Sequence, residues 1–402
     1  MFTKRRHIFS PIAIDIGATA VRALQLAWDG RQPRLIGAAF EEIPRDAWAG
    51  SLRPDAVRVA LVEALRRGKF HGRRAVTALS HGEYQIKSVR LPPMPAEEMA
   101  SAVEFEALER FAIASDAAQF RHIPAGEVRH GNEIKQEIIV FAGMAEAIRE
   151  RIALFESLRL QPEAIDAAPC AMARAFVRFL RRADDVHAVN VFVEMGYRST
   201  CVVITHGTAI NFLKVVELGG EHLNLAVSAA LGIPTEEAGR LRLRLMRNNG
   251  GRRADDAAEV PEELQNTVGD AVRAPIERLI RELQLCLRYF AVTFRGERPT
   301  SITFVGGEAH EPQLTKLAAE AIDIPCTIGN PLRGIQDAGL VCGPDRRTQT
   351  PSWAVATGLA FYGTALIHQA DGTLAGSARA PTNAALAAAG TPVAAGSGGR
   401  SE

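Results

Sequence analysis

Residues 12–22 read Ile-Ala-Ile-Asp-Ile-Gly-Ala-Thr-Ala-Val-Arg, and this stretch decides the fold. The apolar run 12–16 predicts a buried strand that carries one acid, Asp15. Gly17, Ala18 and Thr19 then predict a tight turn, and the apolar residues 21–28 predict a return strand. The sequence therefore opens with a hairpin whose turn is small and polar and whose first strand ends beside a carboxylate.

The second half of the chain repeats this arrangement. The apolar run 188–196 contains Glu194 and ends at Gly196, and a turn with Ser199 and Thr200 leads into a strand at 201–205. A third strand is expected at 209–217. A duplication at this long spacing predicts two similar lobes that face each other, and not a solenoid.

A third motif lies at the end of a strand predicted at 301–305, which runs into Gly306 and Gly307. Backbone N–H groups in glycine-rich turns can approach phosphate oxygens closely, and a glycine pair can lie flat against a base or a ribose. Acids such as Asp15 and Glu194 can hold Mg²⁺ directly or through water. Each motif alone is also compatible with a simple turn, but the ordered trio predicts a nucleotide clamped between two lobes.

The rest of the pattern predicts alternating strands and helices. Short strands are expected at 74–79, 85–91 and 135–142, and helices at 54–67, 96–111, 145–158, 221–231, 235–246, 262–294 and 352–367. The expected organisation is lobe I at 8–84 and 166–187, an inserted small α+β subdomain at 85–165, lobe II at 188–350, a helix returning to lobe I at 351–369, and a disordered, Ala/Gly/Pro/Thr/Ser-rich tail at 370–402.

These motifs resemble those of the actin-like superfamily, whose members share a two-lobed, ribonuclease H-like α/β fold. Within it the chain looks most like the PilM family of type IV pilus assembly proteins, which is related to the cell-division protein FtsA. The resemblance spans nearly all of residues 10–367 and is carried by residues 15–26, 90–95, 216–224, 230–238, 304–307 and 353–360.

This resemblance implies that the insertion at 85–165 is the small subdomain that PilM shares with FtsA. It also implies a groove there for the short cytoplasmic N-terminal peptide of an inner-membrane partner similar to PilN. Other pilus or secretion assembly proteins are further expected partners. The protein is then expected in the cytoplasm, peripheral to the inner membrane and associated with it only through partners.

Motifs and resemblance together predict a site for ATP or ADP with Mg²⁺. Asp15 and Glu194 are the expected metal ligands, and no catalytic residue is identified. The expected nucleotide-binding residues are Asp15, Gly17, Ala18, Thr19, Arg22, Glu194, Gly196, Ser199, Thr200, Gly219, Gly220, Arg242, Gly306 and Gly307.

Four positions depart from the family pattern. Arg22 stands where the family usually has Lys, and Glu194 where Asp is usual. Gly239 replaces a side chain expected at the ribose, and Glu308 replaces a frequent third glycine. These changes count against ATP hydrolysis more than against the fold, so we expect at most a weak ATPase. A pseudo-ATPase that binds no nucleotide is an alternative.

Composition narrows the classes of partner. The 402 residues carry a formal net charge of +1, with 47% hydrophobic and 23% charged residues, which is typical of a globular protein with no global attraction to nucleic acid. The basic cluster at 240–253 has no interleaved aromatic residues, so we read it as a solvated helix face or a contact with an acidic partner. The five cysteines have no C-x-x-C spacing, which favours small buried side chains over a metal site.

Several rival functions share these features. A scaffold of type II secretion, similar to the cytoplasmic part of GspL, is one alternative. A small-molecule kinase and a filament-forming protein of the same superfamily are two others. A kinase would need an acid placed to deprotonate a hydroxyl, and the sequence does not identify one.

Overall fold

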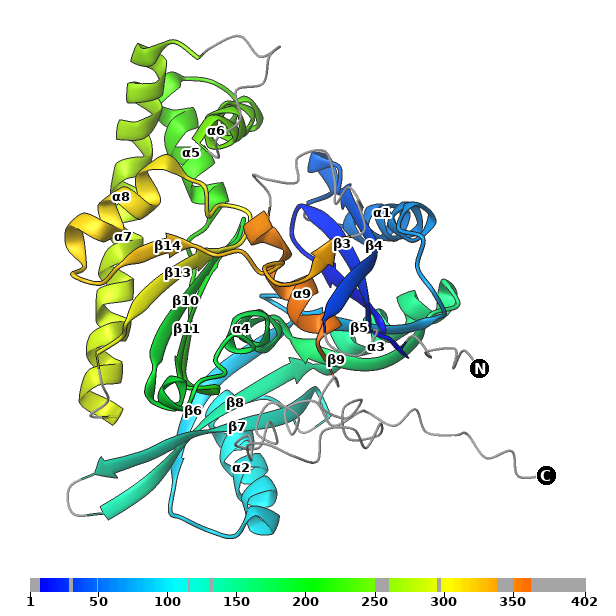
Figure 1. Ribbon diagram of the computed structural model, residues 1–402, viewed down its shortest axis with the longest axis vertical. Helices are drawn as coiled ribbons and strands as arrows, with labels where there is room; N and C mark the ends of the chain where they lie inside the picture. The colour runs from blue at the N-terminus through cyan, green and yellow to red at the C-terminus, as the bar shows by residue number, and fades with distance from the viewer. Residues whose placement is uncertain are drawn as a thin grey trace, which may run out of the picture.

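The computed structural model describes residues 8–28, 32–48, 50–114, 116–130, 133–249, 260–294, 298–337 and 350–362. The tail predicted at 370–402 lies outside these ranges, as do Cys342 and the end of the helix expected at 352–367. Figure 1 shows two lobes beside each other, drawn in blue and in green to yellow, with a smaller unit in cyan and teal below them.

Lobe I is built on a sheet with the strand order β15-β4-β3-β2-β5-β9, and β1 pairs with β3 off this path. All five residues of β2 are buried because helices pack on both faces of the sheet. Ile12 and Ile14 share a core with Leu61 of α1, whereas Ala13 belongs to the core that contains α4 and α9. The strands are β1 (Ile8–Phe9), β2 (Ile12–Ile16), β3 (Ala20–Trp28), β4 (Pro33–Glu42), β5 (Arg74–Leu79), β9 (Gln161–Ala167) and β15 (Gln336–Asp337), with η1 (Arg45–Ala47) and α1 (Arg53–Arg67) between them.

Lobe II is built on a five-stranded sheet with the order β12-β11-β10-β13-β14. The long helix α7 packs against it with apolar residues every three or four positions, among them Val272, Ile276, Leu279 and Leu283. The strands are β10 (Val189–Met195), β11 (Thr200–His206), β12 (Ala209–Val216), β13 (Ser301–Val305) and β14 (Cys326–Ile328). The helices are α5 (Gly220–Leu231), α6 (Thr235–Asn249), α7 (Glu262–Phe294) and α8 (Pro312–Ala321), and η2 (Ala183–His187) leads into the lobe.

The two sheets have the same plan. β2 is antiparallel to β3 and parallel to β5, and β10 is antiparallel to β11 and parallel to β13. The outer strands repeat the match, because β4 and β12 continue antiparallel while β9 and β14 continue parallel. The duplication predicted from the sequence is therefore visible as one topology used twice.

The insertion forms a three-stranded sheet with the order β6-β8-β7, covered on one face by α2. Its elements are β6 (Tyr84–Leu91), α2 (Ala96–Phe111), β7 (Ala118–His130) and β8 (Glu133–Met144). After Met144 the chain returns to lobe I: α3 (Ala145–Ser157) buries Phe155 in the lobe I core, and β9 pairs with β5. The insertion's own sheet is thus narrower than the expected 85–165, because 145–167 pack on lobe I.

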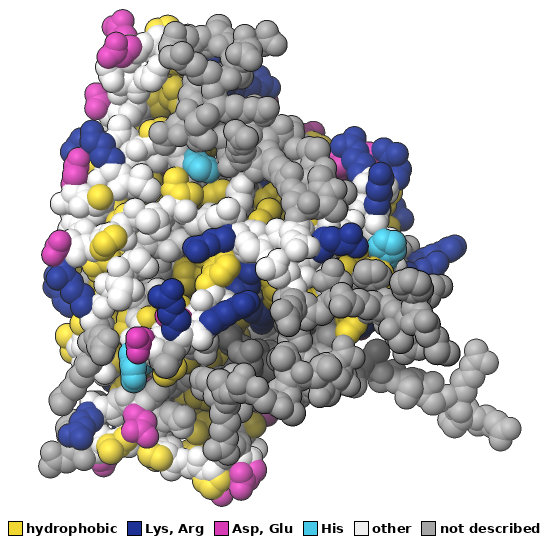
Figure 2. Space-filling view, in the orientation of Figure 1, with side chains coloured by type: hydrophobic (Ala, Val, Ile, Leu, Met, Phe, Trp, Pro, Cys, Tyr) yellow, Lys and Arg dark blue, Asp and Glu magenta, His cyan; other side chains and the backbone are white. Residues whose placement is uncertain are grey.

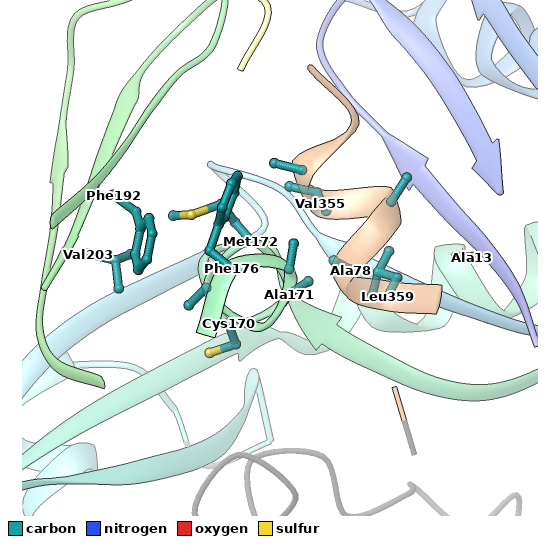
Figure 3. Packing of buried hydrophobic residues seen from close by; sticks show 14 of the residues in the cluster. Ala13, Ala78, Cys170, Ala171, Met172, Phe176, Phe192, Val203, Val355 and Leu359 are labelled. Carbon is teal, nitrogen blue, oxygen red and sulfur yellow. The ribbon is translucent and has the colours of Figure 1, made fainter. Parts of the chain in front are cut away.

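The two lobes meet around α4 (Ala168–Val177) and α9 (Ala354–Ala360), which follows η3 (Thr350–Trp353). In Figure 3, α4 lies between Phe192 and Val203 of lobe II and Val355 and Leu359 of α9. Every residue of α9 is buried. This central pair of helices fixes the two hairpins at the base of the cleft between the lobes.

The face drawn in Figure 2 shows basic side chains interspersed with acidic, apolar and uncharged ones. Such mixing agrees with the near-zero net charge. Among the residues that the structure describes, no helix has the length and apolarity that a bilayer crossing requires. Cys170, Cys201 and Cys286 are buried, as expected of small apolar side chains.

Candidate functional site: a cavity between two hairpins

The first hairpin turn, residues 17–19, is held from both sides. Within the turn the backbone N–H of Gly17 donates to the carbonyl of Ala20 at 3.0 Å. Ser80 Oγ donates to the carbonyl of Ile16 at 2.8 Å, and Arg53 Nη2 donates to the carbonyl of Gly17 at 2.9 Å. The carbonyls of Ile16 and Gly17 therefore already accept hydrogen bonds from side chains that line the cavity.

The second hairpin turn, residues 196–199, has the same local bond. The N–H of Gly196 donates to the carbonyl of Ser199 at 3.0 Å. A Cβ on Gly196 would lie 3.2 Å from that carbonyl oxygen, so a larger residue would have to push the turn open. Both turns are narrow for the same physical reason.

A cavity of about 780 Å³ lies between the two turns. Its volume lies in the range of small-molecule and cofactor pockets. Ten of the fourteen residues predicted from the sequence line it: Asp15, Gly17, Ala18, Thr19, Arg22, Glu194, Gly196, Ser199, Gly306 and Gly307.

The other four predicted residues, Thr200, Gly219, Gly220 and Arg242, lie outside this lining. Thr200 is fully buried and its hydroxyl donates to the carbonyl of Leu218 at 2.6 Å. A Cβ on Gly219 would lie 2.6 Å from the carbonyl oxygen of Gly196, so the start of α5 packs directly against the second turn.

Gly220 and Arg242 belong to a buried ionic network behind the cavity wall. Arg242 is 2% exposed and donates to Glu308 at 2.7 Å and to Glu311 at 2.5 Å. A Cβ on Gly220 would lie 2.2 Å from Glu308 Oε1, so the glycine leaves room for that carboxylate. Glu308 also lines the cavity and therefore connects it with α6.

Asp15 and Glu194 approach the cavity from opposite lobes. Burial raises the pKa of Asp15, and the nearby Arg22 and Arg151 partly oppose that rise. Burial, followed by the charge of Asp15, raises the pKa of Glu194 to about 8, with Arg22 acting in the opposite direction. The two carboxylates thus sense each other across the cleft, and a bound cation would relieve their repulsion.

Arg22 lies beside this carboxylate pair. Its Nη1 is 3.9 Å from Asp15 Oδ2, and its Nε donates to Ser352 Oγ at 3.1 Å. A Cβ on Gly17 would lie 3.5 Å from Arg22 Nη1, so the guanidinium reaches the first turn. Burial lowers the pKa of Arg22, and Asp15 and Glu194 raise it.

The glycine pair at the end of β13 is fixed to both lobes. Gly306 has a φ of +95°, and its Cβ would lie 2.4 Å from the carbonyl oxygen of Met195, so no other residue fits there without strain. Its N–H donates to the carbonyl of Pro351, and the N–H of Glu308 donates to the carbonyl of Met195, each at 3.1 Å. Gly307, which has no atom within 4 Å of its Cβ position, is the open part of the turn.

Sequence reasoning missed several residues of the lining. Arg53 and Arg151 lie on helices far from the motifs in the chain, and no local pattern distinguishes them. Arg151 pairs with Glu83 at 2.7 Å and is therefore neutralised within the wall. Tyr197 and Arg198 were detectable, because they occupy the second turn itself.

The residues present fit a magnesium nucleotide. Two narrow turns offer backbone N–H groups, two carboxylates with raised pKa offer oxygen ligands, and Gly307 leaves an open surface at the third motif. Three or more metal-binding side chains do not gather anywhere within the described ranges.

Comparison with known proteins adds an independent finding. The family model described as "Type IV pilus assembly protein PilM" matches residues 13–364. Among solved structures, the chain is similar to the PilM-PilN type IV pilus biogenesis complex, with 22% identity and a TM-score of 0.71, over 88% of this chain and 98% of the other.

Two further solved structures are similar to this chain at lower identity. The ethanolamine utilization protein EutJ from Carboxydothermus hydrogenoformans matches with 14% identity and a TM-score of 0.50, over 89% of this chain and 90% of that one. MreB 5 of Spiroplasma citri, bound to AMPPNP, matches with 13% identity and a TM-score of 0.44, over 92% and 100%.

Proposed function

Because the chain belongs to the PilM family of type IV pilus assembly proteins, we propose that it is a nucleotide-binding scaffold of that machinery. The match over 13–364 carries this proposal, since it includes both lobes, both hairpin turns and the insertion. The fold is actin-like. The family assignment favours a pilus role over the type II secretion alternative.

The proposed ligand is ATP or ADP with Mg²⁺ in the cavity between the lobes. Asp15 and Glu194 would hold the metal, the two turns would hold the phosphates, and Gly306–Gly307 would lie against the nucleoside. A bound Mg²⁺ would neutralise phosphate charge. We expect hydrolysis to be weak at most, so that the nucleotide acts by binding between the lobes.

Calorimetric titration with ATP and Mg²⁺ tests the nucleotide site. Asp15→Ala removes a carboxylate that lines the cavity, so we expect a loss of affinity of about tenfold or more, as for one charge-assisted contact. Asp46→Ala is the matched control, because Asp46 is an exposed acid of η1 that does not line the cavity. Equal heats from the wild type and Asp15→Ala would refute the site.

The proposed partner is an inner-membrane protein similar to PilN. A PilM-PilN complex shares this fold over 88% of the chain, and this chain carries an insertion with its own sheet. We propose that the cytoplasmic N-terminal peptide of that partner docks on the insertion. The protein would then work in the cytoplasm, attached to the inner membrane through this contact.

Titration with a synthetic peptide that has the cytoplasmic N-terminal sequence of the PilN-like partner tests this interaction. A peptide of scrambled sequence is the control. Hydrogen exchange then locates the contact. We expect protection that depends on the peptide within residues 84–144 and little change in β10–β13. No binding, or protection confined to lobe II, would reject the proposed docking.

A further inference from the structure

Two arginines that the motifs did not single out face the cavity from opposite lobes. Arg53 is the first residue of α1, and Arg198 lies in the turn between β10 and β11. Both line the cavity, and both are half-buried. They therefore reach the cavity from different lobes and meet at the carbonyl of Trp48.

Both guanidinium groups are bonded to uncharged oxygens. Arg53 Nη1 donates to the carbonyls of Ala18 at 2.8 Å and Trp48 at 3.2 Å, and its Nη2 donates to the carbonyl of Gly17 at 2.9 Å. Arg198 Nη2 donates to the carbonyl of Trp48 at 2.5 Å. Within the described residues, neither arginine forms an ion pair.

The other arginines of the lining differ in this respect. Arg151 pairs with Glu83 at 2.7 Å, and Arg22 lies 3.9 Å from Asp15. Among the described residues, no carboxylate lies at ion-pair distance from Arg53 or Arg198, although Glu83 and other acids also line the cavity. Partly buried cations without counter-ions are costly, and an anion that contacts both offsets that cost.

The positive charges of Arg53 and Arg198 also repel each other. Burial lowers the pKa of Arg53, the positive charges of Arg198 and Arg151 lower it further, and Glu83 acts in the opposite direction. The first turn of α1, with Arg53, Pro54 and Val57, lines the same cavity and adds the positive end of a 15-residue helix dipole. The potential on this side of the cavity favours a ligand with several negative charges.

Trp48 connects the two arginines. Its carbonyl accepts from both guanidinium groups, and its ring meets the ring of Tyr197 at 4.5 Å, edge to face. Trp48 follows η1 in lobe I, whereas Tyr197 lies in the turn of lobe II. A small bridge therefore already joins the lobes at the point where the arginines converge.

We propose that Arg53 and Arg198 form a clamp across the lobes for the outer phosphates of a nucleoside polyphosphate, which replace the carbonyl of Trp48 as their shared acceptor. The identity of the ligand rests on the proposed function, whereas the meeting of the two arginines at one carbonyl is an observation of the geometry. Arginine suits this role because its planar fork matches phosphate oxygens.

Calorimetric titration of the full chain with MgATP, AMP and inorganic pyrophosphate tests the clamp. Arg198→Gln removes one cation and only one hydrogen bond of the bridge. We expect a loss of affinity of about tenfold or more for MgATP and pyrophosphate, as for a charge-assisted contact. Affinity for AMP should change less than about twofold, because AMP lacks the outer phosphates.

Arg45→Gln is the matched control. Arg45 also spans the lobes, since its Nη1 donates to the carbonyl of Glu236 at 3.2 Å and its guanidinium lies over the ring of Trp48, but it does not line the cavity. We expect Arg45→Gln to bind MgATP, AMP and pyrophosphate with the affinities of the wild type. Arg53→Gln is a second variant, which also removes bonds to the first turn. Arg198→Lys keeps the positive charge, and we expect its affinity for MgATP to lie between those of the wild type and Arg198→Gln. This variant replaces Arg198→Gln in the test if Arg198→Gln folds poorly.

The outcomes separate the clamp from the proposed function. If Arg198→Gln and Arg198→Lys bind MgATP as the wild type does, or if Arg45→Gln loses as much affinity, the clamp is refuted and nucleotide binding stands. If the wild type binds pyrophosphate but not ATP, nucleotide binding fails; the two arginines then still form a polyphosphate site if Arg198→Gln loses pyrophosphate affinity, and the clamp is refuted if it does not. If the wild type binds neither, the clamp is refuted as well.

Discussion

Arg242 was expected to contact the nucleotide, but its side chain lies elsewhere in the structure. It is buried behind the cavity wall between Glu308 and Glu311. Burial alone would lower its pKa, and the two glutamates raise that pKa well above the ordinary value. Its side chain also donates to Asn224 Oδ1 at 2.7 Å, so α5, α6 and the segment before α8 meet at this point.

Replacing Arg242 should therefore damage stability before it damages ligand binding. Arg242→Leu leaves two buried carboxylates without their partner, and we expect a loss of about 3–5 kcal/mol in the free energy of unfolding. Arg240→Leu is the control two residues earlier, since Arg240 is exposed and pairs with Glu236 on the surface, and it should cost less than about 1 kcal/mol. Denaturant unfolding measures both. A stable Arg242→Leu variant with weakened nucleotide affinity would restore the direct-contact hypothesis.

Glu194 makes the stability of the chain depend on pH. Its pKa is about 8 in the folded protein against 4.5 for an ordinary glutamate, chiefly through burial and then through Asp15. Between these values the folded chain keeps a proton that the unfolded chain has released. Stability attributable to this group is therefore complete below pH 4.5 and is lost as pH rises through about 8.

Glu194→Gln should remove this dependence, because the amide stays neutral. We expect the variant to gain stability relative to wild type as pH rises from about 5 to about 9, by roughly 1–3 kcal/mol. Denaturant unfolding at three pH values, in the presence of a chelator, measures the difference. A difference that stays flat or falls with rising pH would contradict the raised pKa.

At the scale of elements, the sequence predicted the pieces that carry strong local patterns. The buried strands β2, β10 and β13 and the helices α1, α5 and α7 lie close to where periodicity placed them. The strands β4, β7 and β9 and the helix α8 were not anticipated. Local sequence pattern was therefore sufficient to predict the strands that carry the motifs, but it was not sufficient to predict β4, β7 and β9.

The strand β7 shows why a local pattern can miss a strand. β7 contains Pro124 and Gly126, a register shift and many polar residues, so its own sequence does not favour a strand. It is held by pairing with β8 over nearly its whole length. Strand preference depends on cross-strand neighbours, which a local pattern does not contain.

The candidate site was predictable to the same extent. Residues in the hairpin turns, such as Gly17 and Gly196, follow from the motif and line the cavity. Arg53 and Arg151 come from helices whose approach to the cavity depends on packing. The sequence therefore predicted most of the wall that belongs to turns, apart from Tyr197 and Arg198, and missed the residues that tertiary structure brings in.

The crossing of α4 and α9 depends on close backbone contact. A Cβ on Gly358 would lie 1.6 Å from the carbonyl oxygen of Ala171, so the two helices touch at a distance that only glycine permits. Arg174 also donates to the carbonyl of Gly358 at 3.1 Å. Both lobes pack around this pair of helices, as Figure 3 shows.

Gly358→Ala should force the helices apart. Although alanine favours helix formation, we expect a net loss of about 3 kcal/mol in the free energy of unfolding, because the added methyl group meets rigid backbone. Gly307→Ala is the control, since nothing lies within 4 Å of its Cβ position, and its stability should remain within about 1 kcal/mol of wild type. Thermal unfolding compares them. Equal stability of the two variants would show that the crossing can relax.

On the scale of the whole molecule, the insertion is attached to both lobes. It continues from β5 of lobe I, and it contacts lobe II where Asn211 Nδ2 donates to the carbonyl of Ala125 at 2.6 Å. A second contact joins Tyr289 of α7 to Arg90 at 3.1 Å and to Glu137 at 3.3 Å. A change in the angle between the lobes would therefore be felt in the insertion.

Removing the second contact should loosen the insertion selectively. Tyr289→Ala loses both hydrogen bonds and the ring contact with Phe212. We expect faster amide exchange in β6 and β8 and unchanged exchange in β2 and β3, which lie in lobe I. Leu285→Ala, one turn earlier and exposed, is the control and should leave both regions unchanged. Exchange that rises equally in all strands would instead indicate global destabilisation.

The register of β6 and β8 has an evolutionary consequence. Tyr84 and Gly143 are paired across the two strands, so the chain enters and leaves the insertion at neighbouring points. A gene could lose or exchange this segment as a cassette and rejoin its ends with a short turn. The replacement would still have to cover the surface that Ile123, Ile139 and Phe141 cover now, because these side chains share a core with α4. The backbone therefore permits exchange of the insertion, whereas the side chains that pack on α4 restrict it. We expect sequence divergence in the parts of the insertion far from α4 and little change at the residues that contact it.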